Sequence, residues 1–194
     1  MDTLVIDIET KDMYSASSGK EVADLHPSFV GVYSYKQNKY LSFFENDFPA
    51  LAELLKEPAL LVGFSSNRFD IPILAKTLGL SFVAHPRVDL CEEIEMRTGR
   101  RVGLNTLSLI NLGRGKTGAG LEAPTLFREG RLEELKSYCL NDVLLTKDLY
   151  DLVRAKKEIK MPTRDSIFSN QLGLFEKDKL ERVKVDLGPL LTFL

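Results

Sequence analysis

Two acidic residues lie within and directly after the first apolar segment of the chain. Residues 3–8 are rich in β-branched side chains and predict a buried strand, with Asp7 inside this segment and Glu9 directly after it. Side chains two positions apart project from the same face of a strand, so both carboxylates are expected side by side. Such pairs also occur on solvated edge strands, but the apolar residues around Asp7 favour a buried strand. Buried ionised groups are costly unless they are paired, so the fold must supply partners for them.

Further acidic residues follow at different kinds of position. Asp70 comes after the apolar segment 59–63, where a helix is expected to begin. Tyr138 and Asp142 are four residues apart in the longest helical pattern, so they share one face of that helix. Taken alone, Asp70 is explained by helix capping, Tyr138 by burial and Asp142 by surface exposure. Asp89, before another expected helix, is explained as well by capping as by catalysis. Together, four acidic side chains on separate elements favour hard divalent metal ions, and so phosphodiester hydrolysis.

The order of the expected elements predicts an α/β domain with a mixed β-sheet covered by helices. Two early strands form a hairpin around Gln37–Asn38, and strands then alternate with helices. Asn105 is expected to cap a short helix, and the longest helix is expected to break near Asn141. A terminal hairpin is expected from residues 172–176 and 182–187. The other expected strands are 3–8, 29–35, 39–45 and 59–63, and the expected helices are 48–56, 71–78, 89–97, 105–112 and 131–157.

The composition limits the class of protein. With 194 residues, 44% of them hydrophobic, the chain suits one globular domain with its own core. The net charge of −2 gives no support for binding along a nucleic acid duplex, so evidence for nucleic acid must come from the site. Cys91 and Cys139 lack the spacing of a zinc site and are expected to be reduced. No segment resembles a signal peptide or a membrane span, so we expect a cytoplasmic protein.

The three acidic motifs, in this order, resemble those of the DEDD-type 3′–5′ exonucleases of the ribonuclease H-like superfamily, in the tyrosine-bearing subgroup. The motifs are Asp7-Ile-Glu9, Gly63-Phe-Ser-Ser-Asn-Arg-Phe-Asp70-Ile-Pro and Tyr138-x-x-x-Asp142. The resemblance is greatest to exonuclease domains related to family-B DNA polymerases. It implies a ribonuclease H-like mixed sheet flanked by helices on both faces, with residues 1–160 as the exonuclease domain. Residues 161–194 would be a C-terminal extension, expected as a β-hairpin on or near the same domain.

The resemblance also implies a two-metal mechanism with Mg²⁺ or Mn²⁺ as cofactor. Asp7 would bridge both ions, and Glu9, Asp70 and Asp142 would complete their ligand shells. Tyr138 would orient the attacking water. The substrate would be single-stranded DNA or RNA with a free 3′ end, and the products would be nucleoside monophosphates. Two alternatives on the same fold stay open: a nucleic-acid-binding module with little or no catalysis, and an endonuclease or ribonuclease.

One position of the second motif departs from the family pattern. Relatives carry asparagine five or four residues before the second aspartate, where it contacts substrate, and here Ser65 and Ser66 hold these positions. Asn67, three residues before Asp70, or Ser65 is expected to take that role. The other expected substrate contacts are Thr10, Phe69, Arg114 and Lys116.

A basic span without acidic residues could follow the backbone of a single strand, and a solvated basic loop explains it equally well. The cations of this span are Arg97, Arg100, Arg101, Arg114 and Lys116. Its glycine-rich part, residues 113–118, lacks the first glycine of a Walker phosphate loop and follows a helix instead of a strand. We therefore reject a nucleoside triphosphate site.

Overall fold

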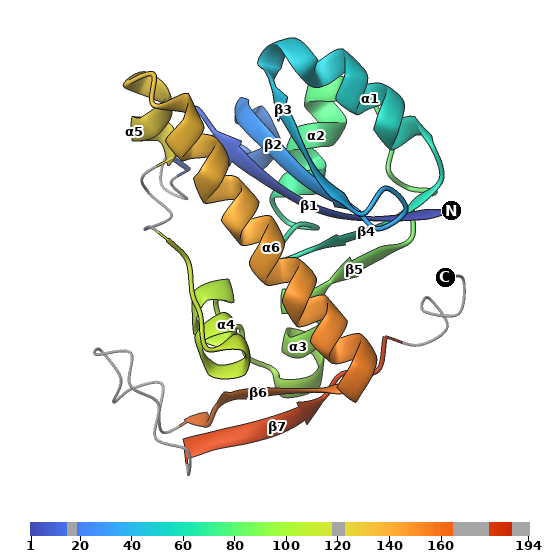
Figure 1. The fold of residues 1–194 in the computed structure, drawn as a ribbon, viewed down its shortest axis with the longest axis vertical. Coiled ribbons are helices and arrows are strands. Elements are labelled where there is room, and N and C mark those ends of the chain that lie inside the picture. The colour runs from blue at the N-terminus through green and yellow to red at the C-terminus, as the bar shows by residue number, and fades with distance from the viewer. Residues whose placement is uncertain (15–18, 118–122, 165–178, 188–194) are drawn as a thin grey trace.

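A five-stranded mixed sheet forms the centre of the molecule (Figure 1). The structure, a computed structural model, describes residues 1–14, 19–117, 123–164 and 179–187. The strands are β1 (Asp2–Thr10), β2 (Pro27–Ser34), β3 (Lys39–Phe44), β4 (Ala59–Gly63) and β5 (Arg87–Asp89), in the spatial order β3-β2-β1-β4-β5. β1 runs antiparallel to β2 and parallel to β4. The predicted α/β fold with ribonuclease H-like topology is confirmed, and β1 is its central strand.

Helices cover both faces of the sheet. α6 (Leu132–Lys156) crosses one face, while α1 (Phe48–Lys56) and α2 (Asp70–Leu78) lie on the other (Figure 1). The alternation of β1 divides the core, because Val5 packs in the cluster that includes α6 and Ile6 packs in the cluster of α1 and α2. The other helical elements are α3 (Leu90–Thr98), α4 (Leu104–Leu112), α5 (Ala123–Arg128), η2 (Val22–Asp24) and η3 (Glu45–Asp47).

α6 is one unbroken helix, so the predicted break near Asn141 is wrong. Buried side chains along its length hold it to the sheet, and a single asparagine costs a helix too little to interrupt it. The helix approaches β2 closely at Gly31. A Cβ added there would lie 3.0 Å from Val143 Cγ2 and 3.1 Å from the Cys139 sulfur. Glycine at this position therefore lets α6 lie close to the centre of the sheet.

Some short elements differ from the prediction. β5 and α5 were not predicted, since three and six residues carry too little pattern. The N-cap of α4 is Gly103, so Asn105 is not the cap; its side chain instead accepts a bond from the backbone of Lys116 at 2.9 Å. No helix within the described ranges has both the length and the apolar character of a membrane span.

The C-terminal strand pairs with a different segment from the one predicted. β7 (Leu180–Lys184) lies antiparallel to β6 (Glu158–Pro162), the strand that directly follows α6. The predicted partner, residues 172–176, lies outside the described residues. Val183 and Val185 join the core cluster of α6, so this two-stranded sheet packs against the main domain. The division of the chain at residue 160, which falls within β6, stays a prediction.

Candidate metal centre

β1 and α6 bring the first acidic pair together with a cysteine. Asp7 and Glu9 lie on the face of β1 that α6 covers, and both are partly buried. One ligand atom from each of Asp7, Glu9 and Cys139 lies within 4.8 Å of the others. The Cys139 thiol donates to the backbone oxygen of Asp7 (3.4 Å) and to Asp7 Oδ2 (3.3 Å). Gly31 pairs with Asp7 across β1 and β2, so the close approach of α6 occurs directly beside this carboxylate.

Asp70 is joined to β1 through the backbone of Ile8. β4 pairs with β1 as far as Val5, so the N–H of Ile8, beyond this ladder, needs another acceptor. Asp70 Oδ1 accepts it at 3.0 Å, and Asp70 is only 4% exposed. The start of α2 has no side-chain cap, so capping does not explain this aspartate. The bond places Asp70 beside the strand that carries Asp7 and Glu9.

Asp142 completes the acidic cluster from α6. It is 2% exposed, and its Oδ2 accepts a bond from Lys116 Nζ at 2.5 Å. Among the described residues, its Oδ1 is buried and has no hydrogen-bond partner. Cys139, three residues earlier, lies on the same face, a helical spacing that could have identified it from the sequence. The pairing with Lys116 differs from the sequence prediction, which places this lysine among the substrate contacts.

Tyr138 is buried one turn before Asp142. It is 5% exposed and packs in a cluster with Phe29 and Leu135. Lys116 Nζ lies 6.0 Å from the centre of its ring, so the same lysine lies close to both predicted members of the third motif. The structure therefore brings Tyr138 to the acidic cluster.

Burial and mutual repulsion raise the pKa values of the clustered carboxylates. Burial, followed by the charges of Asp142 and Asp70, holds the pKa of Asp7 well above its usual value. Burial and then Asp142 raise the pKa of Glu9 to about 8, and burial raises that of Asp70 to about 7. Burial also raises the pKa of Asp142, although Lys116 opposes the shift. The ammonium of Lys116 therefore compensates only part of the negative charge that these acids would carry when ionised.

The donor set fits divalent metal ions. Carboxylate oxygens are the ligands that Mg²⁺ and Mn²⁺ prefer, and the unpartnered Oδ1 of Asp142 offers one directly. The residues that could hold such ions are Asp7, Glu9, Asp70 and Asp142. The Cys139 thiol is a poor ligand, because burial and then the charge of Asp7 raise its pKa well above the usual value and keep it protonated.

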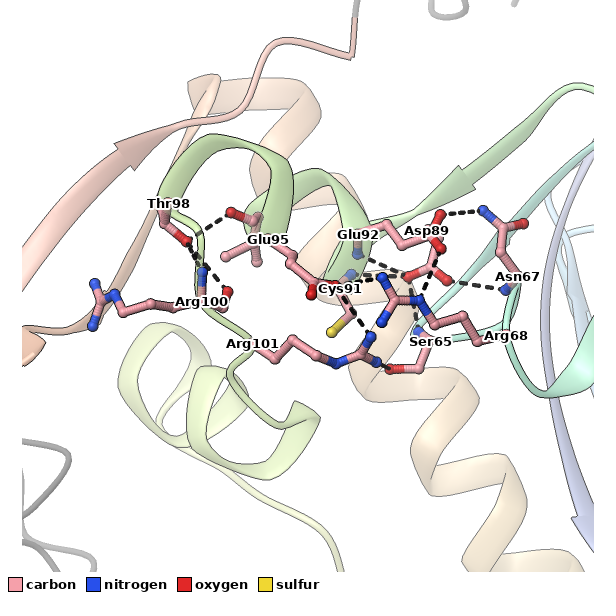
Figure 2. A network of polar contacts seen from close by, with 11 residues as sticks. Ser65, Asn67, Arg68, Asp89, Cys91, Glu92, Glu95, Thr98, Arg100 and Arg101 are labelled. Atoms are coloured by element: carbon pink, nitrogen blue, oxygen red, sulfur yellow. Dashed lines mark hydrogen bonds and ion pairs between the residues drawn. The ribbon is translucent and has the colours of Figure 1, made fainter. Parts of the chain in front are cut away.

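Ser65 and Asn67, the expected substrate contacts of the second motif, point into a polar network with α3 (Figure 2). The side-chain amide of Asn67 donates to Glu92 Oε2 at 2.6 Å. The hydroxyl of Ser65 accepts a bond from Arg101 at 2.9 Å. The backbone N–H groups of both residues donate to Asp89. In this conformation both side chains bind protein partners.

Thr10 and Phe69 lie close in sequence to the acidic residues. Thr10 is buried at the end of β1, and its hydroxyl donates to the backbone of Asp12 at 2.7 Å. Phe69 is half-buried and meets the ring of Tyr14 edge to face, with 6.4 Å between ring centres. Tyr14 is 45% exposed, so this aromatic pair adjoins solvent directly before Asp70.

The cations of the basic span do not form a free patch. Each one pairs with a carboxylate of another segment or of its own helix, so its charge is largely compensated. The pairs are Arg97–Glu93, Arg100–Glu181, Arg101–Glu95, Arg114–Asp148 and Lys116–Asp142. Within the described residues, the basic span therefore offers Lys116 to the acidic cluster and little open positive surface.

Solved structures of a DNA polymerase and of exonucleases share this fold. One is the family B DNA polymerase from the hyperthermophilic archaeon Pyrobaculum calidifontis. Its alignment covers 79% of this chain and 24% of the polymerase chain, at 19% sequence identity and a TM-score of 0.59. Another is E. coli exonuclease I in complex with a dT13 oligonucleotide. Its alignment covers 87% of this chain and 42% of the exonuclease chain, at 12% identity and a TM-score of 0.54. For the zinc-bound form of the exonuclease I complex with single-stranded DNA, the alignment covers 80% of this chain and 41% of the exonuclease chain, at 12% identity and a TM-score of 0.52.

These similarities are structural. No protein-family model matches the sequence, and no curated protein matches it. The chain spans less than half the length of each of these solved structures. At such low identities the comparison establishes a fold shared with a family B DNA polymerase and exonuclease I, of ribonuclease H-like topology.

Proposed function

We propose that this protein is a metal-dependent 3′–5′ exonuclease that removes nucleotides from single-stranded nucleic acid. One observation carries the proposal: three separate elements bring the carboxylates of Asp7, Glu9, Asp70 and Asp142 together, and burial followed by their mutual repulsion raises the pKa of Asp7. A folded protein gains no stability from such a cluster without cations. Binding of metal ions and catalysis therefore best explain why the four carboxylates lie together.

The proposed chemistry is that of two ions, Mg²⁺ or Mn²⁺, which when bound would activate water and stabilise the charge on the phosphate. Asp7 would hold both ions from the central strand, while Glu9, Asp70 and Asp142 would complete the site. Tyr138 would orient the attacking water by hydrogen bonding, since a tyrosine hydroxyl is a weak base at neutral pH. The rigid strand and helix that carry these groups limit their reorganisation during the reaction.

A single-stranded substrate is supported by the surroundings of the site. The paired cations of the basic span leave little positive surface for a long duplex. Phe69 and Tyr14 offer aromatic surface next to Asp70, and stacking of bases on such rings suits unpaired strands. A structural neighbour, E. coli exonuclease I, was solved with a dT13 oligonucleotide. We propose DNA or RNA with a free 3′ end as the substrate, and the cytoplasm as the location.

Product analysis tests this function. Linear single strands of DNA and of RNA, labelled at the 5′ end, are incubated with Mg²⁺ or Mn²⁺ and separated on a gel. We expect a ladder of progressively shorter products, and loss of about a hundredfold or more in rate for Asp142→Asn, since even outer-shell partners of metals often matter that much. Asp151→Asn, a change of the same kind farther along α6, should retain the activity.

The same assay decides between the alternatives. Circular single strands should stay intact, because an exonuclease has no end at which to start. Cleavage of circles would indicate an endonuclease. Binding of the linear strands without shortening, with either metal, would indicate a nucleic-acid-binding module and contradict the proposal.

A further inference from the structure

The carboxylate of Asp89 binds more backbone groups than a helix cap needs. Asp89 ends β5, is 2% exposed and is the N-cap of α3. Its Oδ1 accepts the N–H groups of Cys91 (3.0 Å) and Glu92 (3.2 Å), which is ordinary capping. It also accepts two N–H groups from the loop between β4 and α2: Ser65 bonds to Oδ1 at 2.8 Å and Asn67 to Oδ2 at 3.0 Å (Figure 2).

The loop that Asp89 holds is in an unfavourable conformation. Ser65 has a φ of 62°, in the left-handed region that costs a serine free energy. Such a conformation persists where surrounding contacts fix it, and the bond from Ser65 N–H to Asp89 is one of them. Two side-chain contacts also fix the loop: the Asn67 amide donates to Glu92, and Arg101 donates to the Ser65 hydroxyl (Figure 2).

The same loop determines where Asp70 lies. The backbone oxygen of Ser66 accepts the N–H of Ile71 at 2.9 Å, so the loop forms the start of α2. Ser66 is buried over Gly63, where an added Cβ would lie 2.3 Å from its hydroxyl oxygen. Asp70, four residues after Ser66, then bonds to the N–H of Ile8 on β1. A continuous set of short contacts thus leads from Asp89 to the acidic cluster.

We propose that Asp89 is a positioning residue for the metal centre: it fixes the loop of residues 64–69 and, through it, holds the Asp70 carboxylate against β1. The inference rests on the proposed function for its relation to metal ions. It gives Asp89 a role beyond capping, at a distance from the reacting atoms.

Asp89→Asn separates this role from capping. Asparagine is as good an N-cap as aspartate, so its carbonyl oxygen can keep the bonds to Cys91 and Glu92. Its amide nitrogen would then face the N–H of Asn67, where Oδ2 accepted a bond, and two donors repel each other. The variant should therefore keep α3 and loosen the loop.

The first measurement is hydrogen exchange at the amide of Ile8 in metal-free protein, because that N–H donates to Asp70. For Asp89→Asn we expect exchange at Ile8 about tenfold faster, and Mn²⁺ affinity by calorimetry weaker by about tenfold, within the range seen for outer-shell residues. Exchange at Cys91 and Glu92 should stay close to that of the unchanged protein. Ile94→Val, which trims a buried side chain of α3, is the control for a general loss of stability.

Two results would overturn the proposal. One is exchange at Ile8 in Asp89→Asn equal to that of the unchanged protein. The other is an equal acceleration in Ile94→Val. If the unchanged protein shortened no nucleic acid and bound no Mn²⁺, the proposed function would fail, while the exchange at Ile8 would still decide whether Asp89 holds Asp70.

Discussion

Among the described residues, the ammonium group of Lys116 pairs with the aspartate of the third acidic motif. It bonds to Asp142 at 2.5 Å, and the charges of Asp142 and Asp7 raise its own pKa in spite of the opposing effect of burial. A metal ion bound by Asp142 would meet this ammonium at the same carboxylate. Because like charges repel, Lys116 should compete with the ions that the cluster is proposed to bind.

Lys116→Met tests this competition. Removing the charge should strengthen binding of Mn²⁺ to the protein by about tenfold at low ionic strength, measured by titration calorimetry. Lys136→Met, the same change of charge at a half-buried residue near the start of α6 that pairs with Glu133, should leave the affinity nearly unchanged. Weaker binding by Lys116→Met would show that the ammonium helps to hold the ions.

At the level of single residues, the acidic residues of the cluster could be predicted from the sequence, whereas the contacts that surround them could not. Asp7 and Glu9 are marked by strand alternation and Asp142 by helical spacing, and these signals are local. The partner of Lys116 lies 26 residues away, and its placement depends on the bond between its backbone and Asn105. Such contacts follow from tertiary packing, so no local pattern indicates them.

Among the elements, the position of α6 against the sheet depends on Gly31 of the neighbouring strand β2. A Cβ at Gly31 would lie 3.0 to 3.1 Å from atoms of Val143, Cys139 and Leu140, closer than side chains usually approach. The same contact places Cys139 on Asp7. The distance between α6 and β2 therefore affects both the stability of the core and the geometry of the acidic cluster.

Gly31→Ala should force α6 away from the sheet. We expect a loss of about 1–3 kcal/mol in the free energy of unfolding, as in other overpacked cores, and weaker binding of Mn²⁺. Urea unfolding and calorimetry measure these two effects. In the background of Val143→Ala, which frees space at the nearest contact, the added methyl group should cost less. An equal loss in both backgrounds would contradict the steric explanation.

Elements with long, regular patterns could be predicted from the sequence, and short or partner-dependent ones could not. The strands of the β2–β3 hairpin and the helices α1 and α2 lie within a residue or two of the predicted bounds. β5 has three residues, and its strand character depends on pairing with β4. β7 was predicted as a strand, but its partner β6 directly follows α6 and carries no hairpin signal next to it.

For the whole molecule, the order of elements was sufficient to predict an α/β fold with a mixed sheet, and the resemblance of the acidic motifs added the ribonuclease H-like topology. Sequence identities of 12 to 19% accompany the shared fold of the solved structures, so the fold does not depend on one particular sequence. What the fold requires is the alternation of apolar residues around a central strand. This strand also carries Asp7 and Glu9, and their burial gives the stability of the whole protein a dependence on pH.

Without metal, the folded protein should become less stable as pH rises from about 5 to about 8. Glu9 has a pKa of about 8 in the folded state against an ordinary 4.5, and Asp70 has about 7 against 3.8. Between these values the folded state holds protons that the unfolded chain has released, so each step upward in pH favours unfolding. Calorimetric melting in the presence of a chelator measures this fall, and Glu9→Gln should make it smaller.

Divalent ions should reverse the trend. They bind the ionised carboxylates and displace the protons, so the rise in melting temperature caused by Mn²⁺ should be larger near pH 8 than near pH 5.5. Asp142→Asn should reduce this rise at the higher pH, because it removes one charged ligand without changing the shape of the side chain. A melting temperature that climbs with pH in the absence of metal would contradict the raised pKa values. An equal effect of Mn²⁺ at both pH values would instead show that the ions bind away from the acidic cluster.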